Sequence, residues 1–192
     1  MKFPGIGTRQ AKRFVYFLLA QDTRFVETFA HELSELKKNI GQCASCFRYY
    51  ERRGTQTQCD ACTSDADSSI LLVVEKDTDM DTVRRSGSYA GRYFVLGGTI
   101  PVLENDPASK IRIRELVARI GQGTSEGLTE VVLALSANTE GDMTREYVAK
   151  TLAPLAEKNH IAITALGRGL STGTELEYSD SDTLKNALKN RG

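Results

Sequence analysis

The fold of this chain of 192 residues is decided by the stretch SILLVVE, residues 69–75. Its five consecutive apolar residues lack the polar alternation of a strand that has one face in water. A short β-rich run of this kind predicts a strand buried on both faces, as in sheets that helices cover. Glu75 follows at the carboxyl end of this strand.

Strands and helices alternate along the rest of the chain. We predict a helix that ends near residue 86, a strand at 92–96, a helix at 109–120, a strand at 130–135, a helix at 142–156 and a strand at 161–166. This order is typical of an α/β fold with a mostly parallel sheet flanked by helices. In such sheets, binding sites gather at the carboxyl ends of the strands.

Four cysteines lie ahead of this region in the pattern C-x2-C-x12-C-x2-C, as Cys43, Cys46, Cys59 and Cys62. Two such pairs can arrange four sulfurs around one ion, and a closed shell of four thiolates suits structural zinc. The polar residues between the pairs offer little to bury, so metal binding would supply the folding energy. An iron–sulfur cluster and two disulfides are the alternatives.

The first 40 residues predict two amphipathic helices after a turn, FPGIG at 3–7. Apolar residues recur at helical spacing over 11–19, with Thr8 as the expected N-cap, and a second helix is expected over 23–38. Together, these helices and the four cysteines predict a small helical and zinc-finger N-terminal region in front of the sheet.

Three cations, Arg9, Lys12 and Arg13, lie at the start of the first helix, on the face opposite its apolar residues. Cations beside a glycine turn and a helix N-terminus predict a phosphate-binding corner that grips DNA without reading its sequence. Ordinary solvated surface charge is the alternative. The same two interpretations, nucleic-acid contact or a solvated hairpin, apply to the basic and aromatic run at 48–53.

Four acidic residues, Glu75, Asp79, Glu140 and Asp142, follow two of the predicted strands. Carboxylates that converge at strand ends can hold Mg²⁺ through oxygen ligands. Alternatively, Asp142 caps its helix and Glu75 pairs with a neighbouring basic side chain.

Composition excludes several classes of protein. Hydrophobic residues make up 40% of the chain and charged residues 26%, which is ordinary for a globular protein. The apolar runs are too short to span a membrane, and the N-terminus lacks the apolar core of a signal peptide, so we expect a cytoplasmic protein. The net charge is zero, but residues 1–62 carry ten basic and six acidic side chains, a mildly basic front that hints at nucleic acid.

These segments, in this order, resemble the RecR family of bacterial recombination mediators. The matching segments are FPGIG at 3–7, the four cysteines, VVE at 73–75, SYAGRYFVL at 88–96, NTEGD at 138–142, GRGL at 167–170 and GTELEYSD at 173–180. The resemblance implies a partial helix-hairpin-helix region at 1–41, a four-cysteine zinc finger at 42–63, a Toprim domain at 68–165 and a Walker B-like segment at 166–192.

The resemblance also implies a function. RecR-like proteins form dimers or tetrameric rings, bind single- and double-stranded DNA, and act with RecO and RecF in loading recombinase at single-stranded gaps. By matching position, Arg9 and Arg13 look like residues that contact DNA. The four acids at 75, 79, 140 and 142 look like Toprim acids tied to partner binding more than to catalysis.

The resemblance therefore implies a nucleoid-associated protein that is not an enzyme and that does not require Mg²⁺. A Mg²⁺-dependent Toprim nuclease is the alternative.

The chain departs from the family pattern at two places. It begins two residues before Phe3, so we expect the family's first helix to be missing. Ser171-Thr172 and Gly173-Thr174 stand where the family has Pro-Val and Gly-Gly, which argues against nucleotide binding by the tail.

Overall fold

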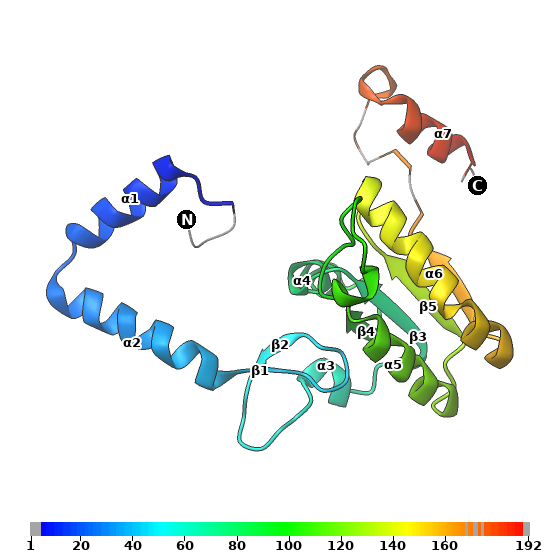
Figure 1. Ribbon diagram of the computed structural model, residues 1–192, viewed down its shortest axis with the longest axis horizontal. Coiled ribbons are helices and arrows are strands. Elements are labelled where there is room, and N and C mark those ends of the chain that lie inside the picture. The colour runs from blue at the N-terminus through cyan, green and yellow to red at the C-terminus, as the bar shows by residue number, and fades with distance from the viewer. Residues whose placement is uncertain (1–4, 168, 171–172, 174, 190–192) are drawn as a thin grey trace. The chain divides into compact units, whose positions relative to one another are not determined.

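The computed structural model describes residues 5–167, 169–170, 173 and 175–189 (Figure 1). Contacts divide the chain into a helical unit, made of residues up to 41 with 50–56, and an α/β unit, made of 42–49 and 57 onward. The predicted segments that fall partly outside the described residues contain Phe3, Pro4, Arg168, Ser171, Thr172 and Thr174.

The helical unit contains α1 (Thr8–Leu19) and α2 (Thr23–Asn39), so both predicted helices are confirmed. Gly7, not Thr8, is the N-cap of α1, and it offers no side chain to the first backbone N–H groups. The chain then enters the short strands β1 (Ile40–Gln42) and β2 (Tyr49–Glu51), which form a two-stranded sheet.

Neither of these two helices has a buried residue, although both are amphipathic. Phe14 is 58% exposed, Leu19 is 74% exposed and Leu33 is 54% exposed. Phe17, Phe25 and Phe29 contact one another in an aromatic row that is also exposed to solvent. The apolar faces of α1 and α2 are therefore not covered within the helical unit itself.

The α/β unit is built on four parallel strands, which confirms the predicted fold class. The strands are β3 (Asp67–Val74), β4 (Gly91–Val95), β5 (Glu130–Ala134) and β6 (Ala162–Ala165), in the order β4-β3-β5-β6. The apolar run of SILLVVE lies in β3, at the centre of the sheet, where strands pair on both sides of it. This position explains why its residues 71–74 are all buried.

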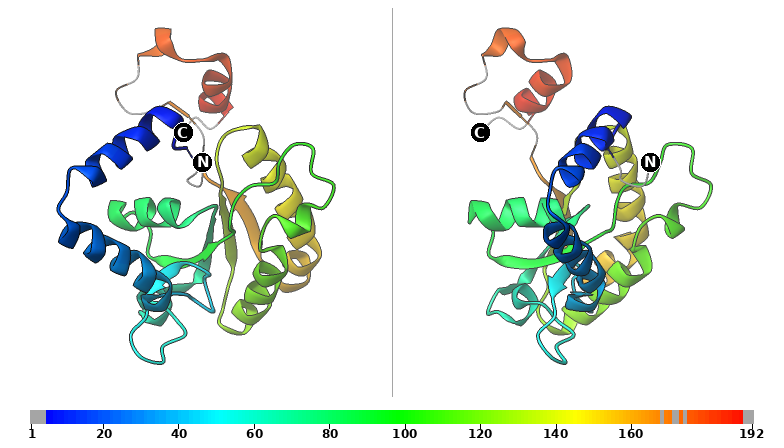
Figure 2. Two further views of the ribbon diagram at one scale, coloured as in Figure 1. Left: turned by 60° about the vertical axis from the view of Figure 1, so that its left-hand side comes forward. Right: turned by 90° about the vertical axis from the view of Figure 1, so that its left-hand side faces the viewer.

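Helices cover both faces of the sheet (Figure 2). On one face, α5 (Ile113–Ser125) and α6 (Thr139–Asn159) pack their apolar residues over β3, β4 and β5 in the larger core. On the other face, α4 (Asp77–Ser86) contributes Met80, and the short helix α3 (Asp60–Thr63) contributes Ala61. The fold therefore leaves the carboxyl ends of the strands at one edge.

Both boundaries of two helices differ from those predicted, since α5 ends at Ser125 and not at residue 120, and α6 ends at Asn159 and not at residue 156. The helix expected from residue 109 is a single turn, η1 (Pro107–Ser109). α5 starts only at Ile113, because Arg112 N–H donates to the carbonyl of Leu96, the residue that follows β4. The helix expected from residue 142 starts at Thr139, because Asn138 caps it by accepting a hydrogen bond from Gly141 N–H.

The chain ends in η2 (Leu176–Tyr178) and α7 (Ser181–Lys189). None of the helices in the described residues combines the length and the apolar character that crossing a bilayer requires.

Candidate functional site

The four cysteines converge on one point. Their Sγ atoms all lie within 4.8 Å of one another, with 3.8 Å between Cys43 and Cys62 and 3.5 Å between Cys46 and Cys59. Sulfurs at about 2.3 Å from a tetrahedral zinc ion are about 3.8 Å apart, so the geometry fits zinc. All four are free cysteines, which excludes the disulfide alternative for this conformation.

Backbone turns of the cysteine segment (residues 42–63) position these sulfurs. Phe47 N–H donates to the Cys43 carbonyl and Cys43 N–H donates to the Arg48 carbonyl, which closes a tight turn around the first pair. Phe47 occupies the left-handed region, with φ 61°. The clustered sulfurs hydrogen-bond to one another, which lowers the pKa of the Cys43 thiol and raises the pKa of the Cys46 and Cys62 thiols.

The acidic residues that sequence reasoning placed at the strand ends each have a separate structural role. Glu75 is buried at the end of β3 and accepts a hydrogen bond of 2.6 Å from Ser136 N–H, which joins the ends of β3 and β5. Asp79 lies in the first turn of α4 and accepts from Lys76 N–H, as one half of a capping box. Both carboxylates therefore hold backbone groups in place.

The other two acids lie in the first turn of α6. Glu140 accepts a hydrogen bond of 3.2 Å from the Thr99 hydroxyl, and Asp142 forms an ion pair of 2.9 Å with Arg145. Within the described residues, the four cysteines are the only group of three or more potential ligands that come close enough to share a metal ion. The structure thus brings the cysteines together but does not gather the four acids into such a group.

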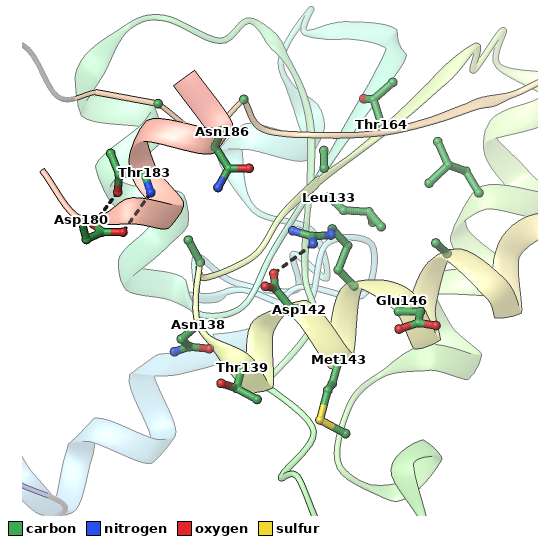
Figure 3. A pocket seen from close by; sticks show the side chains of 17 residues that line it. Leu133, Asn138, Thr139, Asp142, Met143, Glu146, Thr164, Asp180, Thr183 and Asn186 are labelled. Carbon is green, nitrogen blue, oxygen red and sulfur yellow. Dashed lines mark hydrogen bonds and ion pairs between the residues drawn. The ribbon is translucent and has the colours of Figure 1, made fainter. Parts of the chain in front are cut away.

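A polar cavity of about 1150 Å³ lies beside one of these acids (Figure 3). Asn138, Thr139 and Asp142 line it from the start of α6, and Asp180 and Thr183 line it from the C-terminal segment. Their hydrogen bonds are internal, since Thr183 N–H and hydroxyl both donate to Asp180, and Asn138 caps α6. The side chains of Asn138, Asp142 and Asp180 in this lining are therefore already engaged within the chain.

The predicted DNA-binding cations all lie exposed on the first two turns of α1. No ion pair engages Arg9, Lys12 or Arg13 within the part of the chain that the structure describes. Because Gly7 has no capping side chain, the first N–H groups of the helix lack a side-chain acceptor. This combination of free cations and free N–H groups can bind phosphate.

The basic and aromatic run at 48–53 divides into members with different roles. Arg48 pairs with Asp60 at 3.2 Å, and the Tyr50 hydroxyl donates to the Gln56 carbonyl at 2.6 Å. Arg53 is exposed. Arg48 and Tyr50 therefore have structural contacts, and both interpretations stay predictions for the exposed members of the run.

Sequence reasoning missed the residues that attach the cysteine segment to the sheet. Asp60 binds both Arg48 and Arg84, and Arg92 donates to the carbonyl of Cys62. The hydrogen bond from Arg84, with the charge of the same side chain, lowers the pKa of Asp60. The position of Asp60 directly after a metal-ligand candidate was the only local signal, because its partners are 12 and 24 residues away.

Comparison with known proteins covers nearly the full chain. The Toprim domain model matches residues 69–166, and the model "RecR, C-terminal" matches residues 169–191. The Recombination protein RecR of Chlorobium chlorochromatii is 38% identical over 191 residues, which are 99% of this chain and 91% of that protein. The chain belongs to the RecR family.

Two other RecR proteins match a similar share of this chain. The Recombination protein RecR of Bacteroides thetaiotaomicron is 38% identical over 99% of this chain and 88% of its own length, and that of Thermobifida fusca is 36% identical over 99% and 90%. Membership of the RecR family indicates a role in recombinational repair, and the α/β unit contains its Toprim domain.

Proposed function

We propose that the chain is a DNA-binding recombination mediator without catalytic activity, which binds single- and double-stranded DNA with little sequence preference. It acts at the nucleoid, in the cytoplasm, with RecO- and RecF-like proteins to load recombinase at single-stranded gaps. Its parts are a partial helix-hairpin-helix region at 1–41, a zinc finger at 42–63, a Toprim domain at 68–165 and a Walker B-like tail at 166–192. The observation that carries DNA binding is the exposed cation cluster at the uncapped start of α1.

DNA contact by this cluster is electrostatic. Arg9, Lys12 and Arg13 are spaced so that adjacent turns of α1 present their charges together, and the backbone N–H groups of the helix start add donors. Such groups contact phosphate oxygens and do not read base edges, so they position the duplex without selecting a sequence. Affinity should therefore fall steeply as the salt concentration rises.

The exposed apolar faces of α1 and α2 support our proposal of a homo-oligomer, either a dimer or a tetrameric ring. The helical unit by itself leaves the large apolar side chains of both helices in water, including the aromatic row of Phe17, Phe25 and Phe29. Contiguous apolar surface of this kind marks an interaction site. We assign it to a second copy of the chain, which would also bring the cation clusters of several copies to one DNA.

In this proposal the acids at 75, 79, 140 and 142 serve partner binding and not catalysis, with zinc as the structural cofactor and no requirement for Mg²⁺. Buried Glu75 does so only indirectly, by holding the ends of β3 and β5 together. Three of these carboxylates are already engaged, which supports this choice over a nuclease: Glu75 accepts from Ser136 N–H, Asp79 caps α4 and Asp142 pairs with Arg145. Glu140 lies exposed at the surface of the Toprim domain, where a partner can reach it.

The DNA-binding proposal is tested by replacing Arg9 and Arg13 with glutamate. The double variant should bind a fluorescent duplex and a fluorescent single strand at least about tenfold more weakly, since two phosphate contacts become repulsions. Lys150→Glu with Lys158→Glu, which reverses two exposed charges on α6, is the matched control and should keep its affinity. Unchanged affinity in the Arg9/Arg13 variant, with its fold intact, would contradict the proposal.

The nuclease alternative is tested with supercoiled plasmid and Mg²⁺ or Mn²⁺. We expect no nicking by the purified protein. Nicking that Asp142→Asn abolishes would overturn the non-catalytic proposal.

A further inference from the structure

The strand β4 is an edge strand of the Toprim sheet, and the cysteine segment covers its open side. Leu96 N–H donates to the Val74 carbonyl of β3, so the preceding N–H group, that of Val95, points away from the sheet. That group donates instead to the Cys46 carbonyl at 2.8 Å. The Val95 carbonyl accepts from Nη1 of Arg112 at 2.8 Å. Both backbone groups of Val95 are thus satisfied from outside the sheet.

The other end of β4 is held by the second cysteine pair. Nη1 of Arg92 donates to the carbonyl of Cys62 at 2.8 Å and to that of Ala61 at 3.3 Å. Cys46 and Cys62 are both ligand candidates of the metal site. The two ends of the strand are therefore tied to residues that a bound ion would fix.

Side-chain contacts strengthen the same attachment. The Phe47 ring packs on Phe94 of β4 at 5.4 Å between centroids, and the guanidinium of Arg112 lies 5.8 Å from the Phe47 ring centroid. Asp60, next to Cys59, forms an ion pair of 2.8 Å with Arg84 of α4. The attachment thus extends from the edge strand to the helix that covers one face of the sheet.

We propose that the metal centre is the clasp of the Toprim domain: an ion bound by the four cysteines holds the Cys46 and Cys62 carbonyls against β4 and so closes the edge of the sheet. The domain's edge strand depends on a metal that its own residues do not ligate. This assigns the cysteine segment a task that is independent of DNA contact.

Loss of the ion has a specific consequence under this proposal. Nothing then holds the four sulfurs together, and the turns that present the two carbonyls lose their constraint. The open edge of β4 would expose an unpaired N–H and a short apolar strand, the kind of edge that pairs with other chains. Coupling of this type is reciprocal, so a change that weakens the β4 contacts must also weaken metal binding.

The first test is hydrogen exchange of the full-length protein, loaded with zinc and after removal of zinc by a chelator. We expect exchange of the amides in 91–97 to rise about tenfold or more on zinc removal, because local protection reflects the free energy of opening. If all four strands lose protection at once, the whole sheet, and not only β4, depends on the bound zinc, which also supports the proposal. Unchanged protection of β4, with full exchange of the cysteine segment, would overturn the proposal.

The second test keeps all four cysteines. Arg92→Met removes the hydrogen bonds to the Cys62 and Ala61 carbonyls. Arg119→Met, which breaks the ion pair between α5 and Glu126, is the matched control. We expect Arg92→Met to transfer zinc to a colorimetric chelator about tenfold faster than the control. Equal rates of zinc transfer in the two variants would overturn the proposal, whatever their thermal stability.

Discussion

The helical unit and the Toprim domain use similar apolar residues in opposite ways. In the Toprim domain, α5 and α6 bury their leucines, isoleucines and valines against the sheet, as Leu116 with 0% exposure illustrates. In the helical unit, α1 and α2 carry a comparable apolar face, but Leu33 is 54% exposed. Amphipathic periodicity in a helix therefore shows that a face seeks a partner, and does not show that the partner lies in the same chain.

The largest expected effect is on the free energy of unfolding, when one leucine from each region is replaced by alanine. Leu116→Ala should lower the free energy of unfolding by about 3 kcal/mol, because it leaves a cavity in a packed core. Leu33→Ala should lower it far less when unfolding is measured at a protein concentration low enough to separate the copies. Urea denaturation of the zinc-loaded proteins measures both, and equal losses would erase the contrast between the two regions.

The next effect concerns assembly. Leu33→Glu places a charge in the apolar face of α2, so the dissociation constant of the oligomer should rise about tenfold or more. Leu103→Glu is the control, because Leu103 is 92% exposed on a loop of the Toprim domain. Analytical ultracentrifugation over a range of concentrations measures the shift. The assignment of the α2 face to self-association fails if Leu103→Glu dissociates the oligomer and Leu33→Glu does not.

The smallest expected effect depends on pH. Arg84 lowers the pKa of Asp60, so this carboxylate stabilises the fold above its ordinary pKa of about 3.9 and loses that contribution as the pH falls through its lowered value. The Asp60 side chain is 67% exposed, so Asp60→Asn should cost less than about 1 kcal/mol. The difference in melting temperature between parent and variant should be present at pH 7 and vanish in stronger acid. A difference that does not change with pH would contradict a charge-based role.

The elements of the Toprim domain could be predicted from the sequence because their signals are local. The apolar run at 70–74 and the cysteine spacing each identify their structure within a few residues. The start of α5 could not be predicted, because a hydrogen bond from Arg112 to Leu96, the residue that follows the distant strand β4, ends the preceding segment.

The roles of the acids could be predicted only in part for the same reason. The sequence placed Glu75 at the end of a strand, but its partner, Ser136 N–H, lies 61 residues away. Likewise, nothing in the cysteine segment indicates that Arg92 will bind the Cys62 carbonyl from 30 residues further on. Local patterns identify elements and ligands, whereas the contacts that join them depend on the packed sheet.

The contrast between the two regions is tested most directly by the mass of the unaltered, zinc-loaded protein in solution. The chain has a mass of 21.1 kDa. If a second copy covers the faces of α1 and α2, light scattering at micromolar concentration will give an integral multiple of this mass, at least a dimer. A mass of one chain at every concentration would contradict the account.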